Sequence, residues 1–158
     1  MPNIVLTRID NRLVHGQVAT QWCGAIGANL ILVANDEVAG NTLRQGLMNM
    51  AAPSYAAMRY WTIEKTCATI HKANDKQKIF IVCETPTDVL RLVEGGVPIK
   101  KVNIGNMHMA DGKRQVAGSV AVDDKDVAAF ARLRELGVEL EIRRVPQEAS
   151  ENIEKLFK

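Results

Sequence analysis

Lys78-Ile79-Phe80-Ile81-Val82-Cys83 is a lysine followed by an uninterrupted apolar run, and Glu84-Thr85-Pro86 comes directly after it. An apolar run of this length predicts a β-strand that is buried on both faces, as in a parallel sheet. Thr85 and Pro86 are typical of a helix start, and Gly95-Gly96 is typical of a helix end. The stretch therefore predicts one strand-helix unit of an α/β fold.

The same alternation recurs along the chain. The strand candidates are short runs rich in valine, isoleucine and leucine: Ile4–Ile9, Asn29–Ala34, Met58–Ile63, Lys78–Cys83, Lys101–Ile104 and Glu139–Ile142. The helix candidates lie between or after them: Gln17–Ile26, Asn41–Met50, Glu64–Ala73, Thr87–Val93, Asp123–Leu136 and Glu148–Phe157. Alternating strands and helices predict a three-layer α/β fold, with an open, mostly parallel sheet of six to seven strands and helices on both faces.

The length of 158 residues fits one domain, which we expect to span residues 1–158. Within Gly112–Val122, the run Ser119–Val122 predicts an extra strand whose direction stays open. Strand order and homo-oligomerisation also stay open, because the pattern of apolar and polar residues does not indicate either.

Composition narrows the classes of function. The formal net charge is +2 and no Lys/Arg-rich tract occurs, so no nucleic-acid partner is predicted. No apolar stretch approaches the ~20 residues needed to cross a bilayer, and the first residues do not resemble a signal peptide. Cys23, Cys67 and Cys83 lack CxxC spacing and are typical of reduced thiols. We therefore expect a cytoplasmic protein.

Polar residues follow several of the predicted strands. They are Asp10–Gly16, Asn35-Asp36-Glu37, Glu84-Thr85-Pro86 and Gly105-Asn106-Met107-His108. Because ligands bind outside the carboxyl ends of parallel strands, we expect these segments to line one functional edge of the sheet.

The densest of these segments is Arg8-Ile9-Asp10-Asn11-Arg12-Leu13-Val14-His15-Gly16-Gln17. A helix that begins after Gly16 would offer free backbone N–H groups to an anion. A neutral His15 imidazole is a nucleophile, and Arg12 could stabilise the charge of a transferring phosphoryl group. Asp10 could orient His15 or anchor the loop.

Each of these side chains also has a simpler interpretation. His15 could cap the helix, Arg8 and Asp10 could form a structural ion pair, and Arg12 could be a solvated loop charge. By spacing alone, the segment supports only a weak hypothesis of an anion site.

The segment Arg8–Val18 closely resembles the signature of the mannose/fructose/sorbose family of IIB components, which belong to the bacterial phosphoenolpyruvate-dependent sugar phosphotransferase system. Further similarity covers Ala34-Asn35-Asp36, Lys78–Cys83 with Thr85-Pro86, and Asn103–His108. Within the family, the sequence is most similar to members specific for N-acetylgalactosamine or galactosamine.

The resemblance implies that His15 accepts a phosphoryl group through Nδ1 from a phosphohistidine of a IIA protein. The acceptor would be a sugar held by the membrane IIC–IID complex, with which the chain would associate at the inner face of the membrane. Arg12 and Asp10 would act beside His15, and no cofactor or metal is expected. The phosphoryl-binding or partner-binding residues would be Asn11, Leu13, Val14, Gly16, Gln17, Asn35, Thr85, Asn106 and His108.

Two alternatives remain open from the residues. Other classes of IIB protein use a phosphocysteine, and Cys83 ends a strand at the functional edge, but the loop after the first strand contains no cysteine. The chain could instead be a non-catalytic regulatory module that binds a phosphorylated ligand at the same loop. The position of the nucleophile His15 favours the carrier.

Overall fold

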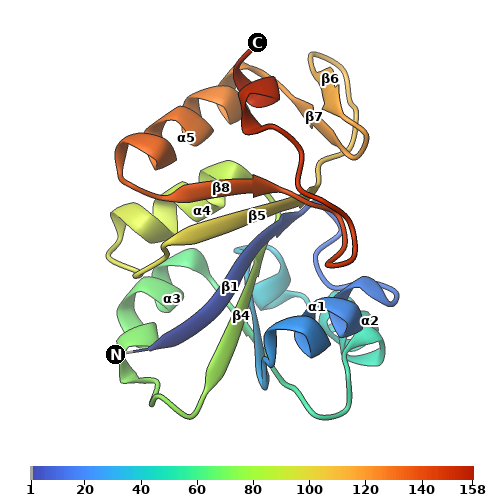
Figure 1. The fold of residues 1–158 in the computed structure, drawn as a ribbon. Helices are drawn as coiled ribbons and strands as arrows, with labels where there is room; N and C mark the ends of the chain where they lie inside the picture. The colour runs from blue at the N-terminus through green and yellow to red at the C-terminus, as the bar shows by residue number, and fades with distance from the viewer. Residues whose placement is uncertain (1) are drawn as a thin grey trace.

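The computed structural model describes residues 2–158. Its main sheet has six strands, in the order β3 (Ala57–Trp61), β2 (Leu30–Ala34), β4 (Lys78–Cys83), β1 (Asn3–Asp10), β5 (Lys101–Asn106) and β8 (Glu139–Ile142). Every pair of neighbouring strands is parallel. The predicted open parallel sheet is therefore confirmed, and its carboxyl edge lies where the arrowheads of β1, β5 and β8 point (Figure 1).

The helices cover the two faces of the sheet and create two apolar cores. One core includes Trp22 and Cys23 of α1 (Val18–Ile26) and Met48 of α2 (Thr42–Ala51). The other core receives side chains from α3 (Ile63–Thr69), α4 (Pro86–Glu94) and α5 (Asp124–Glu135). Strand β4 alternates between these cores, because successive side chains of a strand point to opposite faces. This arrangement gives the three predicted layers.

Local sequence signals determine where most helices begin. The Thr85 side chain accepts a hydrogen bond from the Asp88 amide, and Pro86 occupies the first turn of α4. Asp123 and Asp126 form a reciprocal capping box at the start of α5. Helix α1 instead begins without a side-chain cap, and it ends at Gly27, which has a left-handed φ of 69°. The uncapped start of α1 leaves backbone N–H groups free beside the loop that precedes it.

Two predicted elements are corrected by the structure. The strand expected at Met58–Ile63 ends at Trp61, because Thr62 caps α3 by accepting a hydrogen bond from the Lys65 amide. The helix expected at Glu148–Phe157 is wrong: only the 3-10 turn η3 (Ile153–Phe157) forms there. The Glu151 amide donates to the Ile142 carbonyl in an isolated antiparallel bridge, which holds the preceding chain extended.

The segment whose direction was open forms a separate hairpin. Strands β6 (Arg114–Ala117) and β7 (Val120–Val122) pair antiparallel in a two-stranded sheet beside the ends of β5 and β8 (Figure 1). The extra strand predicted within Ser119–Val122 is therefore present, but it does not extend the main sheet.

Candidate active site

The loop between β1 and α1 stands at the carboxyl edge of the sheet and carries His15. Leu13 has a left-handed φ of 60° and Gly16 one of 50°, so the chain turns sharply on both sides of His15. Backbone strain at a residue other than glycine persists only where the surrounding packing holds it. Here the side chains of Leu13 and Val14 are buried in the core under α1 and α2. Both predicted site residues therefore pack into the core, and Val14 also lines the hollow beside His15.

The imidazole of His15 is held by Asp10. His15 Nε2 lies 2.9 Å from Asp10 Oδ2, while Asp10 Oδ1 accepts a hydrogen bond of 3.0 Å from the Arg12 amide. Asp10 is fully buried, whereas 18% of the His15 side chain is exposed. A carboxylate facing Nε2 favours the tautomer with its proton on Nε2, which leaves the lone pair on Nδ1. Asp10 thus both orients His15 and anchors the loop.

Arg8 lies beneath this pair, and it is buried as well. Its Nη2 is 3.2 Å from Asp10 Oδ2, and its Nη1 donates a 2.7 Å hydrogen bond to Asn103 Oδ1. Burial lowers the pKa of the Arg8 guanidinium, and the neighbouring Asp10 carboxylate opposes that shift. The structural ion pair between Arg8 and Asp10 that the sequence suggested is present.

A hollow opens on one side of the loop, between it and α2. Arg12, His15 and Gly16 line it from the loop, and Arg44 and Leu47 line it from α2. Arg12 is exposed at this hollow, and Arg44 is paired with Glu37. Arg44 and Leu47 are not among the predicted site residues, because nothing in the pattern of α2 indicates which loop the helix faces.

A second hollow opens on the opposite side of the same loop. Asn11, Thr85 and His108 line it together with Glu84 and Lys113. The second hollow therefore brings three of the predicted site residues together, but it does not include His15. Burial raises the pKa of the Glu84 carboxyl group in this hollow.

The remaining predicted residues serve the loops or stand apart. The Asn106 carbonyl accepts a 2.9 Å hydrogen bond from the Asn11 amide and so ties the loop to β5. Asn35 is buried, and its side chain accepts a hydrogen bond from the Val38 amide. Gln17 is exposed at the start of α1 and makes no side-chain cap there.

The cysteines are poor nucleophiles in this structure. Cys83 is fully buried, and burial raises the pKa of its thiol well above the ordinary value. Burial also raises the pKa of Cys23 to about 11. Since the thiolate is the reactive form, neither residue competes with His15. Among residues 2–158, no group of three or more His, Cys, Asp or Glu could hold a metal ion.

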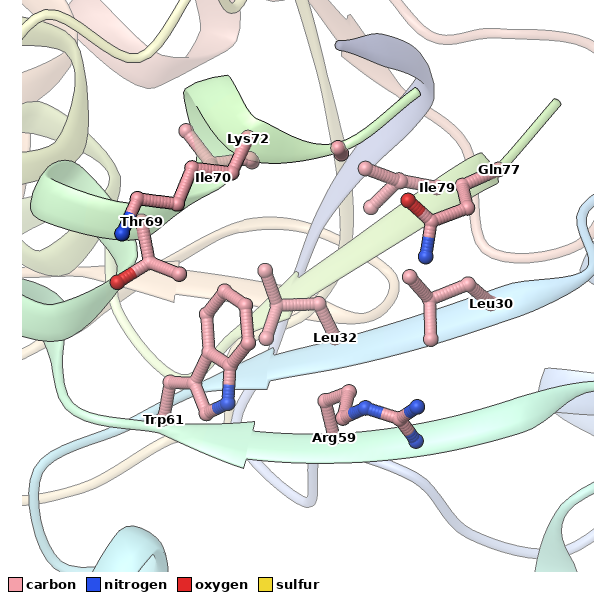
Figure 2. Close-up of a pocket in the computed structure, with 10 residues that line it drawn as sticks. Leu30, Leu32, Arg59, Trp61, Thr69, Ile70, Lys72, Gln77 and Ile79 are labelled. Carbon is pink, nitrogen blue, oxygen red and sulfur yellow. The ribbon is translucent and has the colours of Figure 1, made fainter. Parts of the chain in front are cut away.

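An apolar pocket of about 200 Å³ lies on the other face of the sheet (Figure 2). Leu32, Trp61 and Ile70 line the pocket together with apolar side chains at the amino ends of β2 and β4. Arg59 lies at its rim. Leu32 and Ile70 belong to the core under α3, α4 and α5, so the sheet separates this pocket from His15. Trp61 therefore has no part in the site at His15.

Comparison with known proteins identifies the family. A family model described as the PTS system sorbose subfamily IIB component matches residues 4–158. The chain belongs to this IIB family. It is 54% identical over 157 residues to the N-acetylgalactosamine-specific phosphotransferase enzyme IIB component 2 of Escherichia coli K12, covering 99% of this chain and all of that protein.

A longer relative and a solved structure agree with this assignment of the IIB chain. The mannose-specific EIIAB component of E. coli K12 is 42% identical over 143 residues, which cover 90% of this chain and 44% of that protein. The crystal structure of the N-acetylgalactosamine-specific IIB component 1 of E. coli superimposes with a TM-score of 0.92 at 49% identity, covering 96% of this chain and 99% of that one. No helix within residues 2–158 is long and apolar enough to span a membrane.

Proposed function

We propose that this IIB chain is a phosphocarrier. It accepts a phosphoryl group on Nδ1 of His15 from a phosphohistidine of a IIA protein, and it passes the group to a sugar held by the membrane IIC–IID complex. One observation carries the proposal: Asp10 faces Nε2 of His15 at 2.9 Å, which favours the tautomer with its lone pair on Nδ1. A protein that only binds a phosphorylated ligand would not need an oriented nucleophile at this position.

The proposed transfer needs no cofactor, because each bond that forms is matched by a bond that breaks. In the first step the lone pair of His15 Nδ1 attacks phosphorus, the N–P bond of the IIA phosphohistidine breaks, and the IIA imidazole leaves with the bonding electrons. In the second step a sugar hydroxyl attacks phosphorus, the His15 N–P bond breaks, and the hydroxyl proton passes to a base of the membrane complex. Throughout both steps Nε2 keeps its proton against Asp10, which stabilises the positive charge of the phosphorylated ring.

Charge stabilisation comes from groups of the loop. Arg12 lines the same hollow as His15, and its planar guanidinium can donate two hydrogen bonds to phosphoryl oxygens. The free N–H groups at the start of α1 add to this, since the helix begins without a side-chain cap. We therefore propose that neither a metal nor a cofactor takes part.

The face of α2 beside His15 is suited to a protein partner. Leu43, Leu47 and Met50 are 74%, 62% and 84% exposed, and Leu47 lines the same hollow as His15. Exposed apolar side chains beside a reactive group are typical of an interaction site. We assign this face, with Arg12, to docking of IIA. Asn11, Thr85, Asn106 and His108 on the other side of the loop are assigned to partner contact.

The names of the relatives support the proposed sugar and the proposed donor. Two E. coli proteins named N-acetylgalactosamine-specific IIB components are 54% and 49% identical to this chain, and on this basis we propose N-acetylgalactosamine or galactosamine as the sugar. The E. coli EIIAB component, whose name joins IIA and IIB, supports a IIA donor. The proposed location is the cytoplasm, at the inner face of the membrane through IIC–IID.

The test is covalent labelling of the chain. Incubation with phosphoenolpyruvate, the general phosphotransferase enzymes and a IIA protein is expected to add one phosphoryl group, measured by intact mass. The adduct should be labile in acid and stable in base, as a phosphohistidine is. His15→Ala should abolish it, and His71→Ala, which changes an exposed histidine far from the site, should not. An equal acid-labile adduct on His15→Ala would exclude His15 as the acceptor.

A further inference from the structure

Three buried polar residues stand side by side across three neighbouring strands. In the parallel register Arg8 of β1 is opposite Asn103 of β5, and Asn103 is opposite Glu141 of β8. All three are buried, within strands that are otherwise mostly apolar. These strands lie side by side in the sheet (Figure 1). Buried polar groups are costly unless they are hydrogen-bonded, so the partners of these three side chains are decisive.

The row is a continuous chain of hydrogen bonds that ends at His15. Asn103 Nδ2 donates to Glu141 Oε2 at 3.1 Å and to the Arg143 carbonyl at 3.0 Å. These bonds fix the amide so that its oxygen faces Arg8 Nη1 at 2.7 Å. Arg8 Nη2 then reaches Asp10 Oδ2, which is the same oxygen that faces His15 Nε2. This chain of hydrogen bonds thus connects the imidazole to a residue two strands away.

Packing confines the Arg8 guanidinium on two sides. A Cβ atom at Gly105 would lie 2.0 Å from Arg8 Cζ, so the guanidinium occupies the space that any larger residue would fill. The Trp22 ring lies on another side, with 5.5 Å from its centroid to Arg8 Cζ. The Trp22 indole N–H is in turn held by the Arg144 carbonyl at 3.1 Å.

The bond to Asn103 determines how Arg8 meets Asp10. An arginine tends to bind a carboxylate through two parallel hydrogen bonds. Here Nη1 donates to Asn103 Oδ1 and, at 3.4 Å, to the Arg143 carbonyl, and Nη2 contacts Asp10 at the single oxygen Oδ2. That leaves Asp10 Oδ1 for the Arg12 amide and keeps room on Oδ2 for His15. Without Asn103, Nη1 loses its 2.7 Å acceptor, and a guanidinium that shifts toward Asp10 would compete with both.

We propose that Asn103 and Glu141 are positioning residues for His15, which act through Arg8 and Asp10 to hold the imidazole in one tautomer and one orientation. The inference rests on the proposed function for its consequence in phosphoryl transfer. The orientation of His15 in the unphosphorylated protein does not depend on that function, so the two can be tested separately.

The first experiment measures the His15 tautomer directly. Long-range ¹H–¹⁵N NMR spectra of the unphosphorylated chain distinguish a proton on Nε2 from one on Nδ1. The wild type is expected to hold the proton on Nε2, and Asn103→Ala is expected to give a mixture of tautomers. Glu141→Gln should give a smaller shift, because its amide cannot accept from Asn103, Arg143 and Lys101 at once. Glu139→Gln removes an exposed carboxylate from the same strand and should match the wild type.

The second experiment measures phosphoryl transfer from phosphorylated IIA with the same variants. A misplaced reacting group far from the mutation costs up to ~100-fold in rate, so we expect Asn103→Ala to lower kcat roughly tenfold. KM for phosphorylated IIA should stay at the wild-type value, because neither residue reaches the surface of the hollow. A merely structural role would lower the fraction of folded protein and leave both the tautomer and kcat per folded molecule unchanged.

The outcomes separate the two proposals. Wild-type tautomers in Asn103→Ala and Glu141→Gln would overturn the positioning role while phosphorylation of His15 still stood. A shifted tautomer in a chain that no IIA phosphorylates would retain the positioning role and overturn the phosphocarrier. If Asn103→Ala does not fold, Asn103→Leu keeps the side-chain shape and removes both the oxygen that faces Arg8 and the donor to Glu141. An unchanged tautomer in that variant would contradict the proposal.

Discussion

The two hollows beside the β1–α1 loop differ in charge although they share one edge of the sheet. The hollow toward α2 combines His15 with Arg12 and with Arg44, which is paired with Glu37. The hollow toward α4 contains Glu84, together with Asp126, which is paired with Lys113 at 3.1 Å. We therefore expect a dianionic phosphoryl group to favour the first hollow over the second, where Glu84 adds a carboxylate. The comparison indicates that a sheet edge determines where a site can form, and that side chains from the flanking helices determine on which side of the loop it forms.

The largest expected effect comes from the carboxylate that holds His15. Asp10→Asn keeps the shape but presents an NH₂ or a single oxygen to three donors, so His15 loses its orientation. We expect the transfer rate from phosphorylated IIA to fall on the order of a thousandfold. Leaving Arg8 without its buried partner should also lower the free energy of unfolding by about 3 kcal/mol. Stopped-flow transfer and thermal unfolding measure both, with Asp124→Asn as an exposed control.

The next effect should come from Arg12, which faces the first hollow. Arg12→Ala should slow transfer roughly a hundredfold, because removing one aligned donor from a developing charge has that effect. Arg12→Lys should lie between Ala and the wild type, since an ammonium offers a point charge in place of a fork. Unfolding should change by no more than ~0.5 kcal/mol. A large loss of stability with normal transfer per folded molecule would make Arg12 structural.

A smaller effect is expected on the docking face of α2. Leu47→Asp places a charge where we expect IIA to cover an apolar side chain, so KM for phosphorylated IIA should rise roughly tenfold, about 1.4 kcal/mol, with kcat retained. Leu136→Asp, at the exposed end of α5, is the matched control and should behave as the wild type. An unchanged KM for Leu47→Asp would remove α2 from the IIA interface.

The smallest effect on transfer should come from the second hollow. His108→Ala and Thr85→Ala should leave kcat unchanged and raise the KM of a partner by less than about threefold, as for contacts at the rim of an interface. Thr85→Ala should still cost about 1 kcal/mol of stability, because the cap of α4 is lost. A tenfold fall in kcat for either variant would contradict the proposed difference between the two hollows. It would indicate that Thr85 or His108 acts in phosphoryl transfer.

Most of the fold could be predicted from the sequence, because the signals for strands and for helix starts are short-range. Continuous apolar runs such as Lys78–Cys83 indicate strands buried on both faces, and caps such as Thr85 and Asp123 indicate helix starts. The C-terminal helix was predicted wrongly at Glu148–Phe157, because a single long-range bridge from Glu151 to Ile142 outweighs local helix preference there. Direction within the β6–β7 hairpin was equally inaccessible, since it depends on pairing that the pattern does not record.

By itself, the sequence determined the strand-helix alternation, the edge where polar residues gather, and the loop that carries His15 with Asp10 and Arg12. These follow from periodicity and from residues adjacent in the chain. Only the tertiary structure decided that Asp10 faces Nε2, that Arg44 and Leu47 join His15, and that Thr85 and His108 lie in another hollow. The alignment of Arg8, Asn103 and Glu141 was also visible only in the tertiary structure. Strand register brings Asn103 next to Glu141, about 40 positions away, and next to Arg8, about 95 positions away.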